Sequence, residues 1–274
     1  MVKTREEIVD WLDRCKVEKY VVNEDLSVDV EGNVEISNGY LLEIGVKFGV
    51  VSGNFNCSYN KLTSLEGCPE RVGGSFHCGS NMLFSLEYCP VNVVGNFYCS
   101  NNKVSSLIGS PVSIGGDFYC SANKLQNLVG CPVNVAGDFY CGYNQLVSLV
   151  GCPLFVGGNF GCHNNSLISL DGCPDKVGGN FGCGCNQLVS LVGCPSDVGG
   201  NFSCYNNSLI NLMGCPESVG GDFDCSGNEN LATVFNDMGF SQINLYVKNK
   251  GLNDSLNKGL LEVEIKKVIA GKKV

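Results

Sequence analysis

The sequence of 274 residues contains nine consecutive segments that repeat every 21 residues without insertion or deletion. Each segment follows the pattern V-G-G-x-F-x-C-x-x-N-x-L-x-S-L-x-G-C-P-x-x, with its phenylalanine at Phe55, Phe76, Phe97, Phe118, Phe139, Phe160, Phe181, Phe202 and Phe223. A fixed period of this length is typical of stacked supersecondary units that bury their apolar faces only against neighbouring units. We therefore expect one elongated solenoid domain.

The F-x-C part of each repeat predicts a strand, because an apolar, a variable and an apolar residue alternate. With no insertion between repeats, successive strands should be parallel and in register. Asparagines recur at the turn after each strand, where their amides can satisfy backbone groups: Asn60, Asn81, Asn102, Asn123, Asn144, Asn165, Asn186, Asn207 and Asn228. The glycine pair should allow a tight bend, and the proline after G-C predicts an extended return side with little helix.

Most of the 18 cysteines fall into two ladders, where a ladder is one position followed through successive repeats. The first runs every 21 residues from Cys57 to Cys225, and the second from Cys68 to Cys215, with Ser110 in one cysteine position. A thiol packs well as a small apolar group, so we expect reduced, buried cysteines and a cytoplasmic location. Neighbouring thiols would lie about 4.8 Å apart, so distance alone does not exclude a disulfide.

The first residues of the chain predict a short helix over residues 4–16. Thr4 and Glu7 match a capping box, and Ile8, Leu12 and Cys15 follow on one helical face. Residues 30–50 align with the next repeat but are more charged, as expected of a terminal unit that shields the stack.

The period fades after residue 228. Residues 231–240 predict a short helix, and two strand-like runs follow at 243–247 and 261–269, the second of which fits a helix equally well. We divide the chain into an N-terminal helical cap (1–29), a degenerate capping repeat (30–50), nine repeats (51–235) and a C-terminal cap (236–274).

The repeat wording L-x-S-L-x-G-C-P-x-x-V-G-G-x-F-x-C-x-x-N-x-L resembles the leucine-rich repeat over roughly residues 30–235. The short unit is similar to the bacterial subclass found in secreted effectors, and the G-G-x-F-x-C-S-x-N-x-L-x-S-L-x-G-C-P form resembles repeat proteins of bacteria and bacteriophages. The resemblance implies a repeat solenoid, a curved array with one parallel β-sheet on the concave face, a short N-terminal helix and a mixed C-terminal cap. It also implies that the concave face binds proteins.

The chain departs from this family in two ways. The segment from Val72 to Phe76 is one residue longer than the usual L-x-x-L, so the turn into each strand should differ. The ubiquitin-ligase domain that follows the repeats in some bacterial effectors is absent, so ligase activity does not carry over.

Composition and charge argue against several classes of function. Residues 51–245 hold five basic and thirteen acidic residues, which disfavours a nucleic-acid groove. No apolar run is long enough for a signal peptide or a membrane span, so we expect no membrane partner.

We also expect no enzyme, no cofactor and no metal site. The two histidines, His77 and His163, lie four repeats apart, and the cysteine spacings alternate between 10 and 11 without a paired C-x-x-C motif. His163 with Asp138 is the one acid–base pair worth testing.

If phenylalanine and cysteine point inward, the residues before, between and after them should form the concave face. The middle ladder then contains Tyr98, Tyr119 and Tyr140, followed by a glycine notch at Gly161 and Gly182. Tyrosine provides rigid, amphipathic contact area, so these three residues are candidates for partner binding, although tyrosine also simply suits exposed strands. The other candidate residues are Asp117 and Asp138, which border the stripe as a hydrogen-bonding rim, and Tyr143, His163 and Tyr205, which lie beside the notch.

Three functional hypotheses remain open at this point. The first is a non-catalytic scaffold that binds a protein partner on the concave face. The second is a structural component of a virion or surface assembly, and the third is a small-molecule site at the Gly161/Gly182 notch. The sequence does not indicate an oligomeric state.

Overall fold

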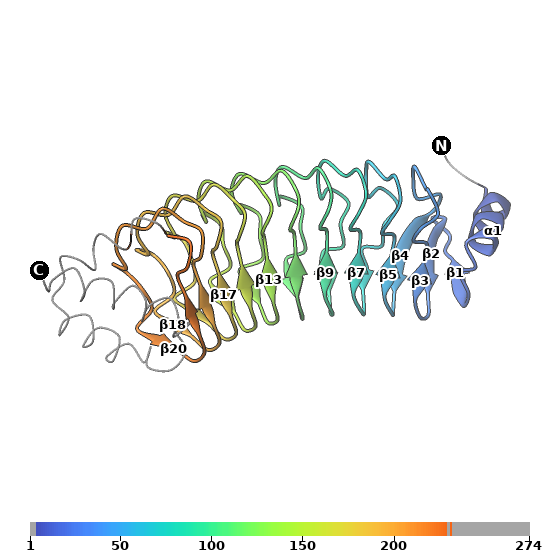
Figure 1. The fold of residues 1–274 in the computed structure, drawn as a ribbon. Coiled ribbons are helices and arrows are strands. Elements are labelled where there is room, and N and C mark those ends of the chain that lie inside the picture. Colours follow the sequence, from blue (N-terminus) through green and yellow to red (C-terminus); the bar gives the residue numbers. More distant parts are fainter. Residues whose placement is uncertain (1–3, 229–230, 232–274) are drawn as a thin grey trace, which may run out of the picture.

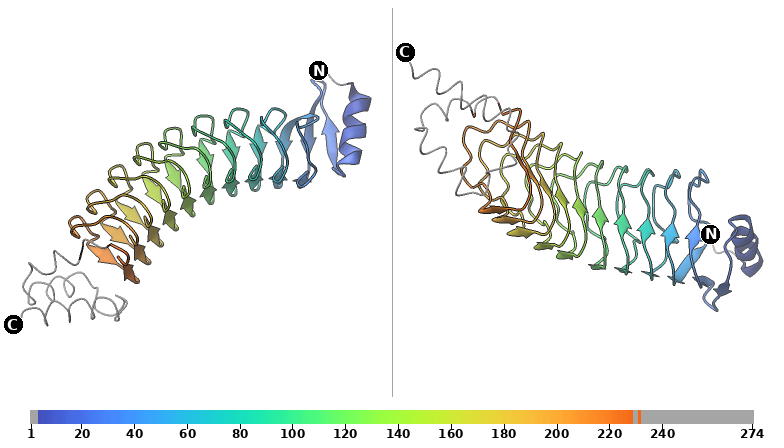
Figure 2. Two further views of the ribbon diagram at one scale, coloured as in Figure 1. Left: turned by 45° about the horizontal axis from the view of Figure 1, so that its top comes forward. Right: turned by 60° about the horizontal axis from the view of Figure 1, so that its bottom comes forward.

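The computed structural model describes residues 4–228 and residue 231. These residues form a curved stack of similar turns, which runs from the N-terminus at the right of Figure 1 toward the left. A helix closes the N-terminal end of the stack. In Figure 2 the strands lie on the inner side of the curve and the extended return segments on its outer side. The predicted solenoid with little helix is confirmed.

The main sheet contains ten parallel strands in simple sequence order. Its strands are β3 (Val34–Glu35), β5 (Phe55–Asn56), β7 (Phe76–His77), β9 (Phe97–Tyr98), β11 (Phe118–Tyr119), β13 (Phe139–Tyr140), β15 (Phe160–Gly161), β17 (Phe181–Gly182), β19 (Phe202–Ser203) and β21 (Phe223–Asp224). Each phenylalanine pairs with the phenylalanine 21 residues away, and Val34 of the degenerate repeat pairs with Phe55. The in-register parallel arrangement follows from the uninterrupted period.

The expectation of one sheet is incomplete, because a second line of short strands precedes the main sheet. It is divided into a six-stranded and a five-stranded sheet. The six-stranded sheet contains β1 (Tyr20–Val22), β2 (Ser27–Val30), β4 (Lys47–Val51), β6 (Arg71–Val72), β8 (Asn92–Val93) and β10 (Ser113–Ile114). The five-stranded sheet contains β12 (Asn134–Val135), β14 (Phe155–Val156), β16 (Lys176–Val177), β18 (Asp197–Val198) and β20 (Ser218–Val219). From β4 onward, each of these strands ends four residues before the phenylalanine of the next main-sheet strand.

The core is built from the ladders of phenylalanine, cysteine, leucine and valine. The phenylalanine rings from Phe55 to Phe223 follow one another with centroids 4.9–5.7 Å apart. Cysteines of the first ladder from Cys57 to Cys204 are buried free thiols, as expected. Burial raises the pKa of the thiols of this ladder from Cys78 to Cys204, for example that of Cys99 to about 12, which keeps them protonated and apolar.

The asparagine ladder has the structural role that the sequence predicts. Asn123 is 4% exposed, and its Nδ2 donates to the carbonyl oxygens of Cys99 and Cys120, each at 3.1 Å. Its Oδ1 accepts from the backbone N–H of Val104 at 3.1 Å. One side chain therefore ties together two consecutive turns, and the same pattern recurs along the array.

The glycine pair serves close packing between repeats rather than an unusual backbone bend. The left-handed backbone lies instead at the glycine of G-C-P, for example Gly130 with φ of 95°. In the pair, a Cβ on Gly178 would collide with the carbonyl oxygen of Gly157, and a Cβ on Gly179 would lie 2.5 Å from Asn159 Oδ1. Close approach of adjacent turns therefore favours glycine at both positions, although Ser52, Val94 and Ala136 occupy the first position of the pair in three repeats.

The N-terminal end is closed by α1 (Arg5–Arg14), whose predicted capping box between Thr4 and Glu7 is present. Ile8 and Leu12 are buried as expected, while Cys15 is only partly buried. Trp11, which the helical face analysis did not include, packs edge-on against Phe48 at 6.2 Å. The helix therefore covers the apolar end of the stack.

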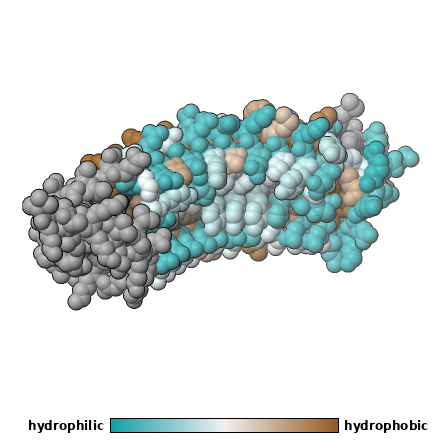
Figure 3. All heavy atoms as spheres, in the orientation of Figure 1, coloured by the Kyte–Doolittle hydropathy of each residue, from teal (hydrophilic) through white to brown (hydrophobic). Residues whose placement is uncertain are grey.

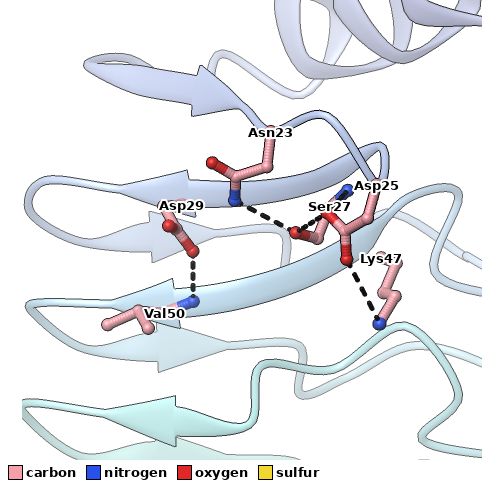
Figure 4. A network of polar contacts seen from close by, with 6 residues as sticks. All are labelled: Asn23, Asp25, Ser27, Asp29, Lys47 and Val50. Carbon is pink, nitrogen blue, oxygen red and sulfur yellow. Dashed lines mark hydrogen bonds and ion pairs between the residues drawn. The ribbon is translucent and has the colours of Figure 1, made fainter.

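An antiparallel pair, β1 and β2, lies between α1 and the first parallel strand. Figure 4 shows its polar contacts: Asp25 accepts from the N–H and the Oγ–H of Ser27, and its carboxylate lies 3.9 Å from Lys47 Nζ. These hydrogen bonds lower the pKa of Asp25. Asp29 accepts from the backbone N–H of Val50 at 2.7 Å, which binds the hairpin to the first turn.

The expected helix at 231–240, the strands at 243–247 and 261–269, and the C-terminal cap as a whole lie outside the described residues, apart from Leu231, which is buried.

Candidate binding face

The side chains before, between and after each Phe–Cys pair form one surface on the inner side of the curve, which we call the sheet face. Phe118 and Cys120 are fully buried, whereas Tyr119 between them is partly exposed, so the predicted alternation is confirmed. Figure 3 shows a pale band along the middle of this face, bordered by hydrophilic residues. In the sequence, the middle ladder from Tyr98 to Gly182 is less polar than the ladder of Asn, Asp and Ser residues that precedes it in each repeat.

Four aromatic side chains stack along this middle ladder. The ring centroids of His77 and Tyr98 are 4.5 Å apart, those of Tyr98 and Tyr119 4.7 Å, and those of Tyr119 and Tyr140 5.1 Å. The rings are tilted by only 22–23° from one pair to the next. We call these four residues the aromatic ladder. His77, which shares this repeat position in the sequence but was not among the predicted binding residues, is its first member.

The hydroxyl groups of the aromatic ladder have polar neighbours. Tyr98 Oη accepts from Asn96 Nδ2 at 2.8 Å. Burial raises the pKa of Tyr119 to about 12, with further contributions from the negative charges of Asp117 and Asp138. Burial and the charge of Asp138 also raise the pKa of Tyr140. Tyr119 and Tyr140 are therefore neutral at physiological pH, next to two carboxylates.

Asp117 and Asp138 belong to a ladder of side-chain acceptors that the sequence interpretation treated only as a polar rim. Each side-chain oxygen accepts from the backbone N–H of the same position in the next repeat: Asn96 from Asp117 at 2.9 Å, Asp117 from Asp138 at 2.8 Å, and Asp138 from Asn159 at 2.7 Å. Asn54, Ser75, Asn159, Asn180 and Asn201 do the same in other repeats. One oxygen of each side chain is thus used by the fold.

The glycine notch is narrower than the sequence predicts. The ring of Tyr140 extends over Gly161, where an added Cβ would lie 2.6 Å from Tyr140 Cδ1, and Gly161 is buried. A Cβ on Gly182, by contrast, would have only the carbonyl oxygen of Phe160 within 4.0 Å. The open space is therefore confined to Gly182, which corrects the two-residue notch.

The remaining candidate residues surround this part of the face. The ring of His163 lies edge-on to Tyr143 at 5.2 Å, and its Nδ1 would be 3.5 Å from a Cβ on Gly161. Tyr205 extends over Gly184, and burial and its hydrogen bond with Cys185 raise its pKa. The rings of Tyr143 and His163 are thus in contact beyond the aromatic ladder, whereas Tyr205 lies two repeats past His163 and packs over Gly184.

His163 and Asp138, the acid–base pair considered from the sequence, are not hydrogen-bonded to each other. Burial lowers the pKa of His163, and no carboxylate offsets this effect. The Oδ2 of Asp138 accepts from Asn159 Nδ2 at 3.1 Å instead. Across residues 4–228, no group of three His, Cys, Asp or Glu residues could hold a metal ion. The same part of the chain contains no helix with the length and apolar character needed to cross a membrane.

Comparisons with known proteins support the fold. Neither the family models nor the curated protein sequences include a match to this chain. Among solved structures, YopM from Yersinia enterocolitica WA-314 is similar, with a TM-score of 0.54 and 18% sequence identity. The similarity covers 81% of this chain and 45% of the YopM chain, so this chain spans less than half of its neighbour. Since YopM is a leucine-rich repeat protein, the solenoid is leucine-rich-repeat-like.

Proposed function

We propose that this protein is a non-catalytic recognition scaffold that binds a protein partner on its sheet face through the aromatic ladder. The observation that carries the proposal is the continuous stack from His77 to Tyr140 on the inner side of the curve. Stacked rings lose little conformational freedom on binding, so they provide contact area at low entropic cost. A leucine-rich-repeat-like fold agrees with an interaction scaffold.

The proposed binding face differs from the outer surface in how its aromatic residues are arranged. On the return side, apolar residues such as Val112 and Leu154 are each 76% exposed. These residues are aliphatic and do not stack as aromatic rings do. On the sheet face, each tyrosine is held by its neighbouring rings, and Tyr98 is also held by Asn96. A rigid, amphipathic surface of this kind is typical of interaction hot spots.

Capture of partners from a lysate of the source cells tests this proposal. The test variant replaces Tyr98, Tyr119 and Tyr140 with alanine, and the matched control replaces the exposed return-side residues Val112, Val133 and Leu154 with alanine. We expect a stoichiometric partner with the wild type and the control, and its loss with the tyrosine variant. Loss with the control alone would place the interface on the return side and contradict the proposal.

We further propose that the protein acts in a reducing cytoplasm, and that it comes from a bacterium or a bacteriophage. The buried free thiols from Cys57 to Cys204 support a reducing location, because thiols exposed during folding in an oxidising compartment would mispair. The proposal of a bacterial or bacteriophage origin rests on the sequence of the repeats alone.

A further inference from the structure

The sheet face carries negative charge without any positive charge. At the four positions around each Phe–Cys pair, from the residue before phenylalanine to the second residue after cysteine, residues 33–227 contain five acidic residues and no lysine or arginine. The acidic residues are Glu35, Asp117, Asp138, Asp222 and Asp224. The nearest lysines in the sequence, Lys61, Lys103 and Lys124, follow the turn asparagines, and Lys103 Nζ lies 5.4 Å from the ring centroid of Phe84.

The fold does not require the charges of Asp117 and Asp138. Their structural task is to accept one backbone N–H of the next repeat, and the neutral oxygens of Asn159 and Asn180 perform it at 2.8 and 2.7 Å. Two carboxylates on adjacent strands of one face also repel each other. The two negative charges are therefore not needed for the structural role of these residues. Their repulsion lowers the stability of the folded state, and a bound cation would remove that repulsion.

These two carboxylates lie at the aromatic ladder rather than elsewhere on the face. Both act on the hydroxyl of Tyr119, the central tyrosine of the three. The Oδ1 of Asp117 accepts from Asp138, which leaves its second oxygen available to a ligand. Carboxylates combined with tyrosine hydroxyls and ring edges fit the guanidinium or ammonium group of a basic side chain together with its apolar stem.

We propose that the occupant of the aromatic ladder is an extended polypeptide segment that contains arginine or lysine, with a basic side chain bound between Asp117 and Asp138 beside Tyr119. This inference rests on the proposed function and specifies the partner. Three spacings of about 4.8 Å separate His77 from Tyr140, so an extended segment of about four residues spans the ladder. Residues of the segment on either side of the basic side chain contact Tyr98 and Tyr140.

The test measures binding of a short fluorescein-labelled peptide of alternating arginine and serine by fluorescence anisotropy, with the full chain. A peptide of alternating glutamate and serine serves as the charge control. The test variant is Asp117→Asn with Asp138→Asn, which keeps the backbone hydrogen bonds. The matched control, Asp171→Asn with Asp175→Asn, removes the same charge from exposed positions on the return side.

We expect the arginine peptide to bind and the glutamate peptide not to bind. The Asp117/Asp138 variant should bind about tenfold more weakly, whereas the Asp171/Asp175 variant should stay within about twofold of the wild type. Equal losses in both variants would show attraction to net charge only and overturn the proposal, as would absence of binding. If the tyrosine variant still loses its captured partner in that case, the scaffold function stands and only the basic segment is wrong.

Discussion

The side chain that precedes each phenylalanine shows how one oxygen atom can constrain a position in every repeat. Asn, Asp and Ser are the residues found there from Asn33 to Asp222, and their oxygens accept the backbone N–H of the next turn. These residues carry an acceptor oxygen on a side chain short enough to place it at the neighbouring backbone. Apolar residues lack the acceptor, and longer polar residues hold it too far from their own backbone.

Replacement of Asp117 tests this requirement. Asp117→Ala removes the acceptor for the N–H of Asp138 and should lower the free energy of unfolding by about 1 kcal/mol. Asp117→Asn keeps the acceptor and should change it by less than about 0.5 kcal/mol. Urea denaturation measures both effects, and hydrogen exchange at the Asp138 amide locates them. Equal destabilisation by alanine and asparagine would show that the charge, not the acceptor, matters.

Tyr119 predicts an alkaline dependence of stability. Its pKa is raised to about 12 in the folded protein, against an ordinary value of about 10 in the unfolded chain. A raised pKa stabilises the folded state fully below pH 10, and this contribution is lost as the pH rises from about 10 to 12. Thermal denaturation against pH should therefore show a smaller alkaline loss for Tyr119→Phe than for the wild type. The same loss in both proteins would contradict this assignment.

The role of a residue could be predicted from the sequence where its side chain has a single chemically reasonable task in the fold. A buried asparagine at every turn can only serve backbone groups, and Asn123 does so. The acceptor ladder was missed because Asn, Asp and Ser are also the ordinary residues of exposed surfaces. Its signal was the absence of every longer polar residue at that position.

At the scale of elements, each repeat contributes two very short strands that are stable only as members of a stack. The first, such as β16 (Lys176–Val177), has one inward residue and therefore no periodic pattern to reveal it. The second, such as β13 (Phe139–Tyr140), is marked by the apolar residues on both sides of its variable position. This difference explains why one sheet was predicted and the second line of strands was not.

The glycines of the middle ladder provide a matched pair of substitutions in adjacent strands. Gly161→Ala places a Cβ 2.6 Å from Tyr140 Cδ1 and should displace that ring, lowering the melting temperature and changing the near-ultraviolet circular dichroism of the tyrosines. Gly182→Ala meets open space and should be neutral or stabilise the protein by up to about 1 kcal/mol.

The comparison between these two variants is the informative result. Similar spectra and melting temperatures would mean that Tyr140 does not extend over Gly161, and the two-residue notch of the sequence interpretation would be restored. The ring position could not be foreseen, because a side chain that extends into the next repeat leaves no mark on the repeat pattern.

At the scale of the molecule, the uninterrupted period determines a curved array with a sheet on its inner side. The candidate residues Tyr98, Tyr119 and Tyr140 were found from the sequence because stacking puts equal repeat positions side by side. The charge of the face was visible residue by residue, but its coincidence with the aromatic ladder required the structure. The central claim is that this face contacts a protein partner.

Site-specific photo-crosslinking tests that claim most directly. Benzoylphenylalanine is placed at position 98 in the aromatic ladder or at position 112 on the return side, and crosslinked species are identified by mass spectrometry from source-cell lysate. We expect a specific protein adduct from position 98, through a peptide that contains arginine or lysine, and none from position 112. An adduct from position 112 with none from position 98 would contradict the account.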